Sequence, residues 1–386
     1  MERNNIFNFA TSELSQDAFI CWFCNWVNFD DNSLSEDEKE LKSLATEFIE
    51  KIIGEKLEDR KVNIKRQYQK IDVLLEIQNK TEFIAKGNNI NPIVDMYVII
   101  EDKVGTDLHS NQIERYRELI SEKNKNINEG KALVKTVYYK IYDEDNMERL
   151  KEEGIDIIFE RKDMLALLEK YKNSFNNILV EDYYNYLNNI EKDVNSYIDK
   201  KLEDWNSNCY IGFFKELKNK ELKNKKKLLE HAIGRQKDCS WGYVNNSSGG
   251  FMGMWWFPLK MDEISQVTKK FQLWQNQLEL NNDLYLQIEQ FYKKEKEIYN
   301  KKNIIAVKYS LGDKDDEKYD EKVKISSEIR NKIYEELKEK LKEKGIEFYK
   351  KRFVAGQYMT VGYLEYNSIK DCENKIEVLQ NSLINL

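Results

Sequence analysis

The chain has 386 residues, of which 34% are charged, and its formal net charge is -7. This length favours two domains, and the acidic balance argues against a general nucleic-acid coat protein, which is usually basic. The five cysteines are sparse, no secretion signal opens the chain, and no apolar run approaches the roughly 20 residues that span a bilayer. The sequence therefore predicts a reduced, cytoplasmic protein without a membrane partner.

Two helices are predicted first along the chain. Thr11 and Ser12 suit the cap of a helix over residues 13–27, which is apolar on almost every side after Asp17 and is therefore expected to be buried. A second helix, over residues 37–53, repeats its apolar side chains at helical intervals.

After the second helix the apolar period changes from 3.6 to about two, which indicates strands. Three consecutive strands are predicted at residues 62–69, 71–78 and 93–103, with a turn-rich connection at 86–92. A helix and two more strands are predicted at residues 108–121, 132–139 and 155–159. Because a strand, helix, strand connection implies a parallel crossover, we expect an α/β domain with a mixed sheet flanked by helices. A helical pattern over 164–202 closes this first domain, residues 1–202.

The second predicted domain, residues 203–386, has a different pattern of helices and strands. It opens with a helical pattern over 203–234 and a Gly- and Trp-rich pair of strands within 237–260. Further strands and a charged helix are predicted at residues 284–288, 304–309, 326–344 (the helix) and 357–365. We therefore expect an α+β domain that selects the substrate or a partner.

The strand over 93–103 ends in Glu101, Asp102 and Lys103. Because side chains alternate along a strand, Glu101 and Lys103 share one face and Asp102 points to the other. Asp72 begins the preceding strand, and pairing as a hairpin brings opposed side chains to roughly 5 Å. An Asp, a Glu and a Lys at one sheet edge suit hydrolysis of a phosphodiester, although such a triplet also occurs by chance at solvated strand ends.

Two other acids compete with Asp72 as the partner of Glu101. Asp95 shares the strand and the face of Glu101, but six residues of strand span roughly 20 Å, which is too far to share a metal. Glu76 lies about 13 Å beyond Asp72 along its strand and is predicted to be an exposed strand residue.

The order Asp72, then Glu101-Asp102-Lys103, resembles the signature of the PD-(D/E)XK nuclease superfamily, which has the restriction-endonuclease-like fold. The resemblance implies that Asp72 and Glu101 bind Mg²⁺ (or Mn²⁺) and that Lys103 orients or deprotonates the attacking water. Mg²⁺ prefers hard oxygen ligands and keeps several waters, so two or three carboxylates suffice. Ile71 stands where the superfamily's name has proline, a departure that many members share.

Two further motifs extend the resemblance over residues 7–160. Gln112 and Tyr116 resemble the QxxxY motif of RecB-like and lambda-exonuclease-like members. A spacing of four residues puts both side chains on one helical face. The resemblance implies that they position the substrate strand. The segment around Glu13 resembles the opening helix of a branch often associated with phage defence. In that branch Glu13 corresponds to an auxiliary metal ligand.

The function that the resemblance implies is Mg²⁺-dependent cleavage of DNA phosphodiester bonds, in phage defence or DNA processing. RNA as the substrate stays open, as do partner proteins and a homo-oligomer. The alternative is a catalytically inactive module of the same fold that binds nucleic acid or a partner protein, which the acidic charge and the long C-terminal half favour.

Other candidate contacts have simpler interpretations. His109 is expected to be a solvated residue at the start of a helix rather than a contact to phosphate. The lysine run over 215–227 is interleaved with glutamates, which favours an exposed helix face over a surface that binds a nucleic-acid backbone. Three tryptophans are predicted to be core residues rather than platforms for stacked bases: Trp241, Trp255 and Trp256.

Overall fold

The computed structural model describes the chain from residue 4 to residue 386 with several gaps. The residues outside the description are 59, 87–88, 105–107, 109–110, 146, 172–176, 224–225, 230–238, 246–249, 260–265, 268–269, 271–282, 296–297, 311–318 and 352–357. The chain divides into two compact units, Met1–Lys192 and Asp193–Leu386. The predicted division into domains after residue 202 stays a prediction.

Five strands form the sheet of the first unit and follow one another in sequence order. They are β1 (Arg60–Tyr68), β2 (Ile71–Lys86), β3 (Asn89–Lys103), β4 (Leu133–Lys140) and β5 (Ile157–Glu160). The pairs β1-β2 and β2-β3 are antiparallel, whereas β3-β4 and β4-β5 are parallel. The prediction of a mixed sheet is therefore confirmed.

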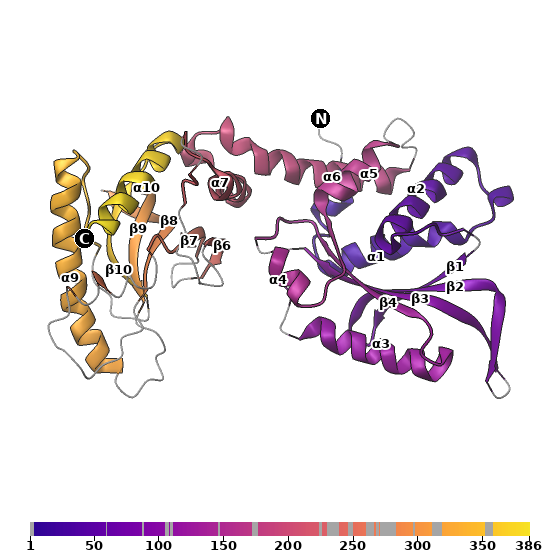
Figure 1. Cartoon of the computed structure of the whole chain (residues 1–386). Coiled ribbons are helices and arrows are strands. Elements are labelled where there is room, and N and C mark those ends of the chain that lie inside the picture. The colour runs from indigo at the N-terminus through magenta and orange to yellow at the C-terminus, as the bar shows by residue number, and fades with distance from the viewer. Residues whose placement is uncertain are drawn as a thin grey trace. The chain divides into compact units, whose positions relative to one another are not determined.

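Helices cover both faces of this sheet (Figure 1). One face carries α3 (Gln112–Asn128), and the other carries α1 (Glu13–Asn25) and α2 (Glu36–Ile53). The unit also contains α4 (Met147–Glu152), α5 (Arg161–Glu169), most of α6 (Ile178–Asn195) and the short 3-10 helices Ile6–Asn8, Trp26–Asn28 and Asp31–Ser33. Ser12 caps α1 by accepting a hydrogen bond from the Ser15 amide, as its residue type predicts.

The core of the first unit is centred on β3. Its residues Tyr97, Val98, Ile99 and Ile100 are fully buried, because helices pack on both faces of the strand. Glu101 follows this apolar run directly, so the fold carries its carboxylate into the interior.

One sequence-based boundary in this unit was wrong. The predicted connection over 86–92 is strand on both sides of residues 87–88, so β2 and β3 form a long hairpin that continues past β1 and β4 (Figure 1). Pro92 pairs with Phe83 beyond two shifts in register, where the ladder tolerates a residue without an amide proton. The helical pattern predicted over 164–202 is confirmed: it contains α5, α6 and two 3-10 helices that belong to the second unit, Ser196–Ile198 and Leu202–Asp204.

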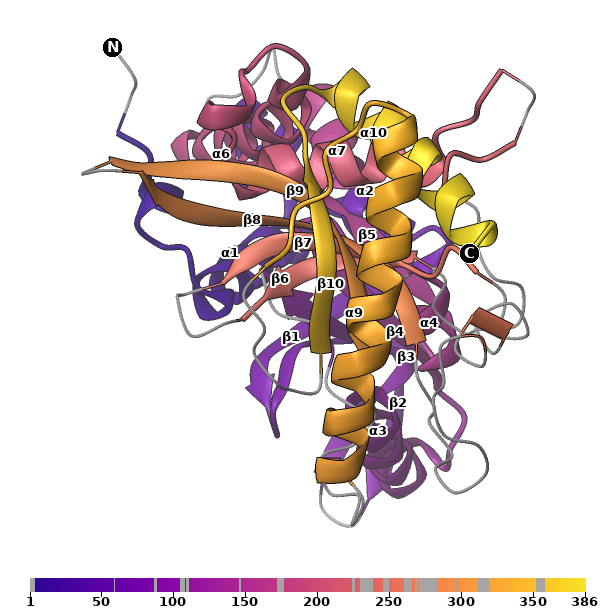
Figure 2. The same ribbon diagram turned by 90° about the vertical axis from the view of Figure 1, so that its left-hand side faces the viewer.

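The second unit contains an antiparallel sheet with the order β10-β9-β8-β7-β6. Its strands are β6 (Cys239–Val244), β7 (Phe251–Trp256), β8 (Asp283–Glu295), β9 (Ile298–Ser310) and β10 (Tyr358–Glu365). Its helices are α7 (Ser207–Asn219), α9 (Tyr319–Glu343) and α10 (Ile369–Ile384). The helices share one apolar core with the sheet, and Figure 2 shows α9 alongside β10. The predicted α+β class is confirmed.

Three details of the second unit bear on the sequence predictions. Trp241 and Trp256 are buried as expected, whereas Trp255 is half-buried. The helix predicted over 203–234 ends at Asn219, because the backbone of Lys220 is extended, so only the first part of the lysine run is helical. Within the described ranges of the chain, no helix is long and apolar enough to cross a membrane.

Candidate active site

The start of β2 and the end of β3 lie side by side. The antiparallel register pairs Val73 with Ile100, so Asp72 lies next to Glu101 where the ladder ends. Lys103, two residues further along β3, makes an ion pair with Glu101, and its Nζ lies 3.9 Å from Oδ2 of Asp72. The fold therefore brings together the three residues that the sequence predicts for the chemistry.

Burial and crowded charge dominate the electrostatics of this edge. Burial, followed by the neighbouring charge of Asp72, raises the pKa of Glu101 to about 7, and Lys103 offsets only part of this effect. Burial would lower the pKa of Lys103, but Glu101 and Asp72 outweigh burial and hold the pKa above its ordinary value. Lys103 is consequently a charged hydrogen-bond donor at neutral pH.

The predicted QxxxY pair lies on the face of α3 that packs against this edge. Gln112 Nε2 donates to Glu101 Oε1 at 2.6 Å and to the Tyr116 hydroxyl at 2.9 Å. The Tyr116 hydroxyl donates to the carbonyl oxygen of Lys70, in the turn before Asp72, at 2.6 Å. These bonds hold Glu101 and the turn in place; the predicted contact with a substrate strand stays a prediction.

A second acidic pair lies on the opposite face of β3, where sequence reasoning assigned no site residue. Asp102 is fully buried and accepts a hydrogen bond from Gln16 Nε2 at 2.5 Å, and Asp17 on α1 is also fully buried. Burial and the charge of Asp72 raise the pKa of Asp17 to about 6, and burial and the charge of Asp17 hold the pKa of Asp102 well above its usual range.

Gln67, near the end of β1, connects this acidic pair to Asp72. Its Nε2 donates to Asp17 Oδ2 at 2.7 Å and to Asp72 Oδ1 at 3.1 Å. The only sequence signal for Asp17 was its place directly before the apolar part of its helix. No comparable signal marks Gln67, whose place depends on the backbone of the β1-β2 turn.

Glu13 lies at the first position of α1, close enough for its charge to contribute to the raised pKa values of Lys103 and Asp102. In the part of the chain that the structure describes, no group of three or more His, Cys, Asp and Glu side chains is arranged to hold a metal ion. The role of Glu13 as a third ligand stays a prediction, and Asp72 with Glu101 is the pair that the geometry offers.

The comparison with protein families identifies the chain's relatives. A family model described as the PD-(D/E)XK nuclease superfamily matches residues 4–213, more than half of the chain. The chain belongs to the PD-(D/E)XK nuclease superfamily. No curated protein and no solved structure matches the chain. The resemblance first seen in Asp72, Glu101 and Lys103 is thus confirmed at the level of the superfamily.

Nucleases of the PD-(D/E)XK superfamily typically use divalent metal ions, and the residues at this edge fit such an ion. Glu101 Oε2 is buried and, among the described residues, has no hydrogen-bond partner. A buried, unpaired carboxylate oxygen is costly, and a cation would satisfy it. Asp72 and Glu101 supply hard oxygen ligands, and Mg²⁺ needs only one or two carboxylates because it keeps waters and binds substrate phosphate.

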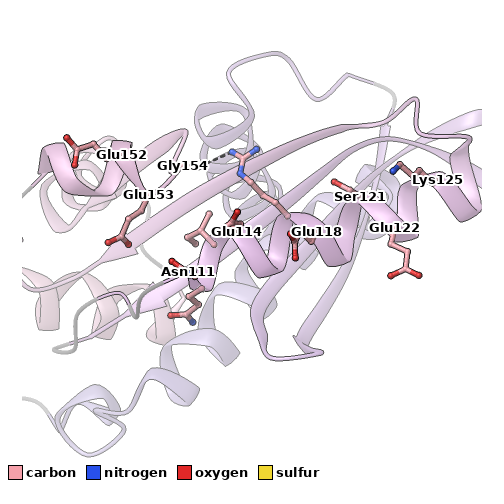
Figure 3. Close-up of a pocket in the computed structure, with 12 residues that line it drawn as sticks. Asn111, Glu114, Glu118, Ser121, Glu122, Lys125, Glu152, Glu153 and Gly154 are labelled. Carbon is pink, nitrogen blue, oxygen red and sulfur yellow. Dashed lines mark hydrogen bonds between the residues drawn. The ribbon is translucent and has the colours of Figure 1, made fainter.

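A groove of about 780 Å³ runs along α3 and the end of α4, and five of its 12 lining residues are glutamates (Figure 3). Glu114, Glu118 and Glu122 line it from α3, Glu152 from the end of α4, and Glu153 from the turn that follows α4. Neither Asp72, Glu101 nor Lys103 lines this groove. The five glutamates outnumber Arg117 and Lys125, so the lining carries a net negative charge, which disfavours a phosphate backbone.

The prediction that Glu76 is exposed was wrong, and the prediction for His109 is not tested. Glu76 is buried, not exposed, because it accepts hydrogen bonds from Lys65, Lys123 and Asn63 on the α3 face of the sheet. It is a structural ion-pair centre. His109 lies outside the described residues.

Proposed function

We propose that the chain is a metal-dependent DNA nuclease that hydrolyses phosphodiester bonds. The observation that carries the proposal is the meeting of Asp72, Glu101 and Lys103 at one sheet edge, where a buried Glu101 oxygen has no hydrogen-bond partner in the described part of the chain. Membership of a superfamily whose members are generally nucleases supports the reaction class.

The roles of the three residues follow from their chemistry. A divalent cation between Asp72 and Glu101 would lower the pKa of a bound water and offset negative charge on the phosphate. In the metal-free chain the raised pKa of Lys103 makes its amine a hydrogen-bond donor; beside a bound cation it would orient the water, or deprotonate it where the cation lowers the pKa of the amine. Gln112 holds Glu101 Oε1 from α3 and leaves Oε2 for the cation.

The choice of DNA and Mg²⁺ rests on the resemblance of the motifs. The pair Gln112 and Tyr116 resembles members that act on DNA strands, and the opening helix around Glu13 resembles a branch often associated with phage defence. Asp72 and Glu101 offer only oxygen ligands, which suit Mg²⁺ or Mn²⁺ rather than a thiolate-binding metal.

A cleavage assay tests this proposal. Purified protein is incubated with single-stranded DNA, duplex DNA and RNA in EDTA, Mg²⁺ or Mn²⁺. We expect cleavage of DNA only with the metals, and its loss in Asp72→Ala and Lys103→Ala. Asp95→Asn is the control, because it removes an acid from β3, the strand that carries Glu101 and Lys103, and is expected to cleave normally.

Each outcome of this assay decides between functions. Cleavage of RNA alone would contradict the proposed substrate. Activity that survives both Asp72→Ala and Lys103→Ala would contradict the proposed site. Binding of DNA without cleavage in any metal would support the alternative function, a catalytically inactive nucleic-acid-binding module.

A further inference from the structure

Gln67 joins two acidic residues that belong to different layers of the first unit. Its single amide nitrogen donates one hydrogen bond to Asp17 on α1 and another to Asp72 on β2. The two donor–acceptor distances are 2.7 Å and 3.1 Å, both within the normal range for hydrogen bonds. Both hydrogens of this amide are therefore directed at carboxylates.

The backbone of Gln67 is in a conformation that residues with a Cβ rarely adopt. Its φ is 52°, in the left-handed region, although the residue belongs to β1. Gln69 and Lys70, with φ values of 50° and 77°, share this region. Three such non-glycine residues within four positions, directly before Asp72, mark a turn that the surrounding contacts must hold in place.

Contacts at both ends hold this turn. At its end the Tyr116 hydroxyl donates to the carbonyl of Lys70, and at its start the Gln67 side chain reaches Asp17. Gln67 is exposed, so burial of its side chain does not explain the conformation. The described contacts that do are its hydrogen bonds to Asp17 and Asp72.

The two oxygens of Asp72 consequently receive separate donors. Oδ1 accepts from Gln67, and Oδ2 accepts from the backbone amide of Asp102 at 3.1 Å. With both oxygens engaged, the carboxylate plane of Asp72 is fixed relative to Glu101. A carboxylate fixed in this way loses little freedom when it binds a cation.

We infer that Gln67 is a positioning residue, which orients the Asp72 carboxylate for a divalent cation by anchoring it to Asp17 on α1. The inference rests on the proposed function, because it assumes that Asp72 binds the metal. Gln67 touches neither the metal nor the substrate in this role. It acts through Asp72, as residues behind metal ligands commonly do.

Two substitutions separate positioning from simple support of the fold. Gln67→Met keeps the length of the side chain and removes both hydrogen bonds. Gln67→Asn keeps the amide, is better suited to the left-handed backbone, and is too short to reach both carboxylates. Gln69→Gly is the matched control, since it relieves the same backbone conformation two residues away.

The test measures Mn²⁺ binding to the intact chain by electron paramagnetic resonance, and thermal stability in EDTA. We expect the Kd for Mn²⁺ to rise about tenfold or more in Gln67→Met and Gln67→Asn, the usual effect of removing a group behind a metal ligand. Gln67→Asn should be at least as stable as the wild type in EDTA. Gln69→Gly should bind Mn²⁺ like the wild type.

The outcomes distinguish this inference from the proposed function. Wild-type Mn²⁺ affinity in Gln67→Asn, with binding lost in Asp72→Ala, would overturn the role of Gln67 and leave the proposed function standing. Equal losses in Gln69→Gly and Gln67→Asn would assign the effect to the turn backbone and also overturn the role. A wild-type chain that binds no Mn²⁺ would overturn the proposed function and the inference together.

Discussion

Substituting Glu101 by Gln should stabilise the metal-free protein at alkaline pH. The fold raises the pKa of Glu101 from 4.5 to about 7, chiefly through burial, so the folded state holds a proton that the unfolded state releases. At about 1.4 kcal/mol per pH unit, the charged form costs the folded state roughly 3 kcal/mol above pH 7. This cost is absent well below pH 4.5 and grows as the pH rises through 7.

Hydrogen exchange of the β3 amides, followed by mass spectrometry in EDTA, measures this effect where it arises. At pH 8 the amides should exchange about a hundredfold more slowly in Glu101→Gln than in the wild type, because tenfold corresponds to roughly 1.4 kcal/mol. At pH 5 the difference should shrink to about 1 kcal/mol or less, because the wild-type carboxyl is then protonated. Comparing both proteins at the same pH cancels the intrinsic exchange rates.

The exposed residue Glu118 provides the control. Glu118→Gln removes one carboxylate from the same unit and should leave β3 exchange unchanged at both pH values. Equal exchange in the wild type and Glu101→Gln at pH 8 would refute the reasoning, as would a difference of the same size at pH 5. Either result would mean that the buried carboxylate is not destabilised by its surroundings.

Three further substitutions have expected outcomes. Lys103→Met should slow DNA cleavage at saturating Mg²⁺ by about a hundredfold or more without weakening Mn²⁺ binding, because it removes a donor and not a ligand; a wild-type rate would contradict its role. Tyr116→Phe should lower the free energy of unfolding by about 1 kcal/mol in urea titration, through loss of the bond to the Lys70 carbonyl, and no change would contradict that assignment. Glu76→Ala should cost about 3 kcal/mol in the same measurement, since it leaves the amine of Lys123, whose side chain is only 12% exposed, without its carboxylate acceptor; no change would contradict the role of Glu76 as an ion-pair centre.

The sequence predicted the elements whose patterns are local. The helices with helical apolar repeats and the strands with a period of two were found at nearly their observed positions. The extension of the β2-β3 hairpin was missed, because Pro92 and its polar neighbours are typical of turns and only the long-range pairing with β2 makes them strand. The C-terminal helix α10 was not predicted, although Ser368 caps it.

The site was predictable to the extent that its residues share a strand or a motif. Alternation along β3 placed Glu101 and Lys103 on one face, and hairpin pairing brought Asp72 beside them. Gln67 could not be found in this way, because its contact with Asp72 depends on left-handed backbone angles. No residue type in the turn predicts those angles. Glu76 was misjudged for a similar reason, since Lys123, one of its partners, comes from α3.

The most direct test of the central claim is the rate of cleavage of end-labelled DNA by the wild type and by Asp72→Asn, measured side by side in Mg²⁺ and in EDTA. Asp72→Asn keeps the shape of the side chain and removes the charge that a cation requires. The proposed site predicts Mg²⁺-dependent cleavage by the wild type and none by Asp72→Asn. Equal cleavage by both proteins, or cleavage by the wild type in EDTA, would contradict it.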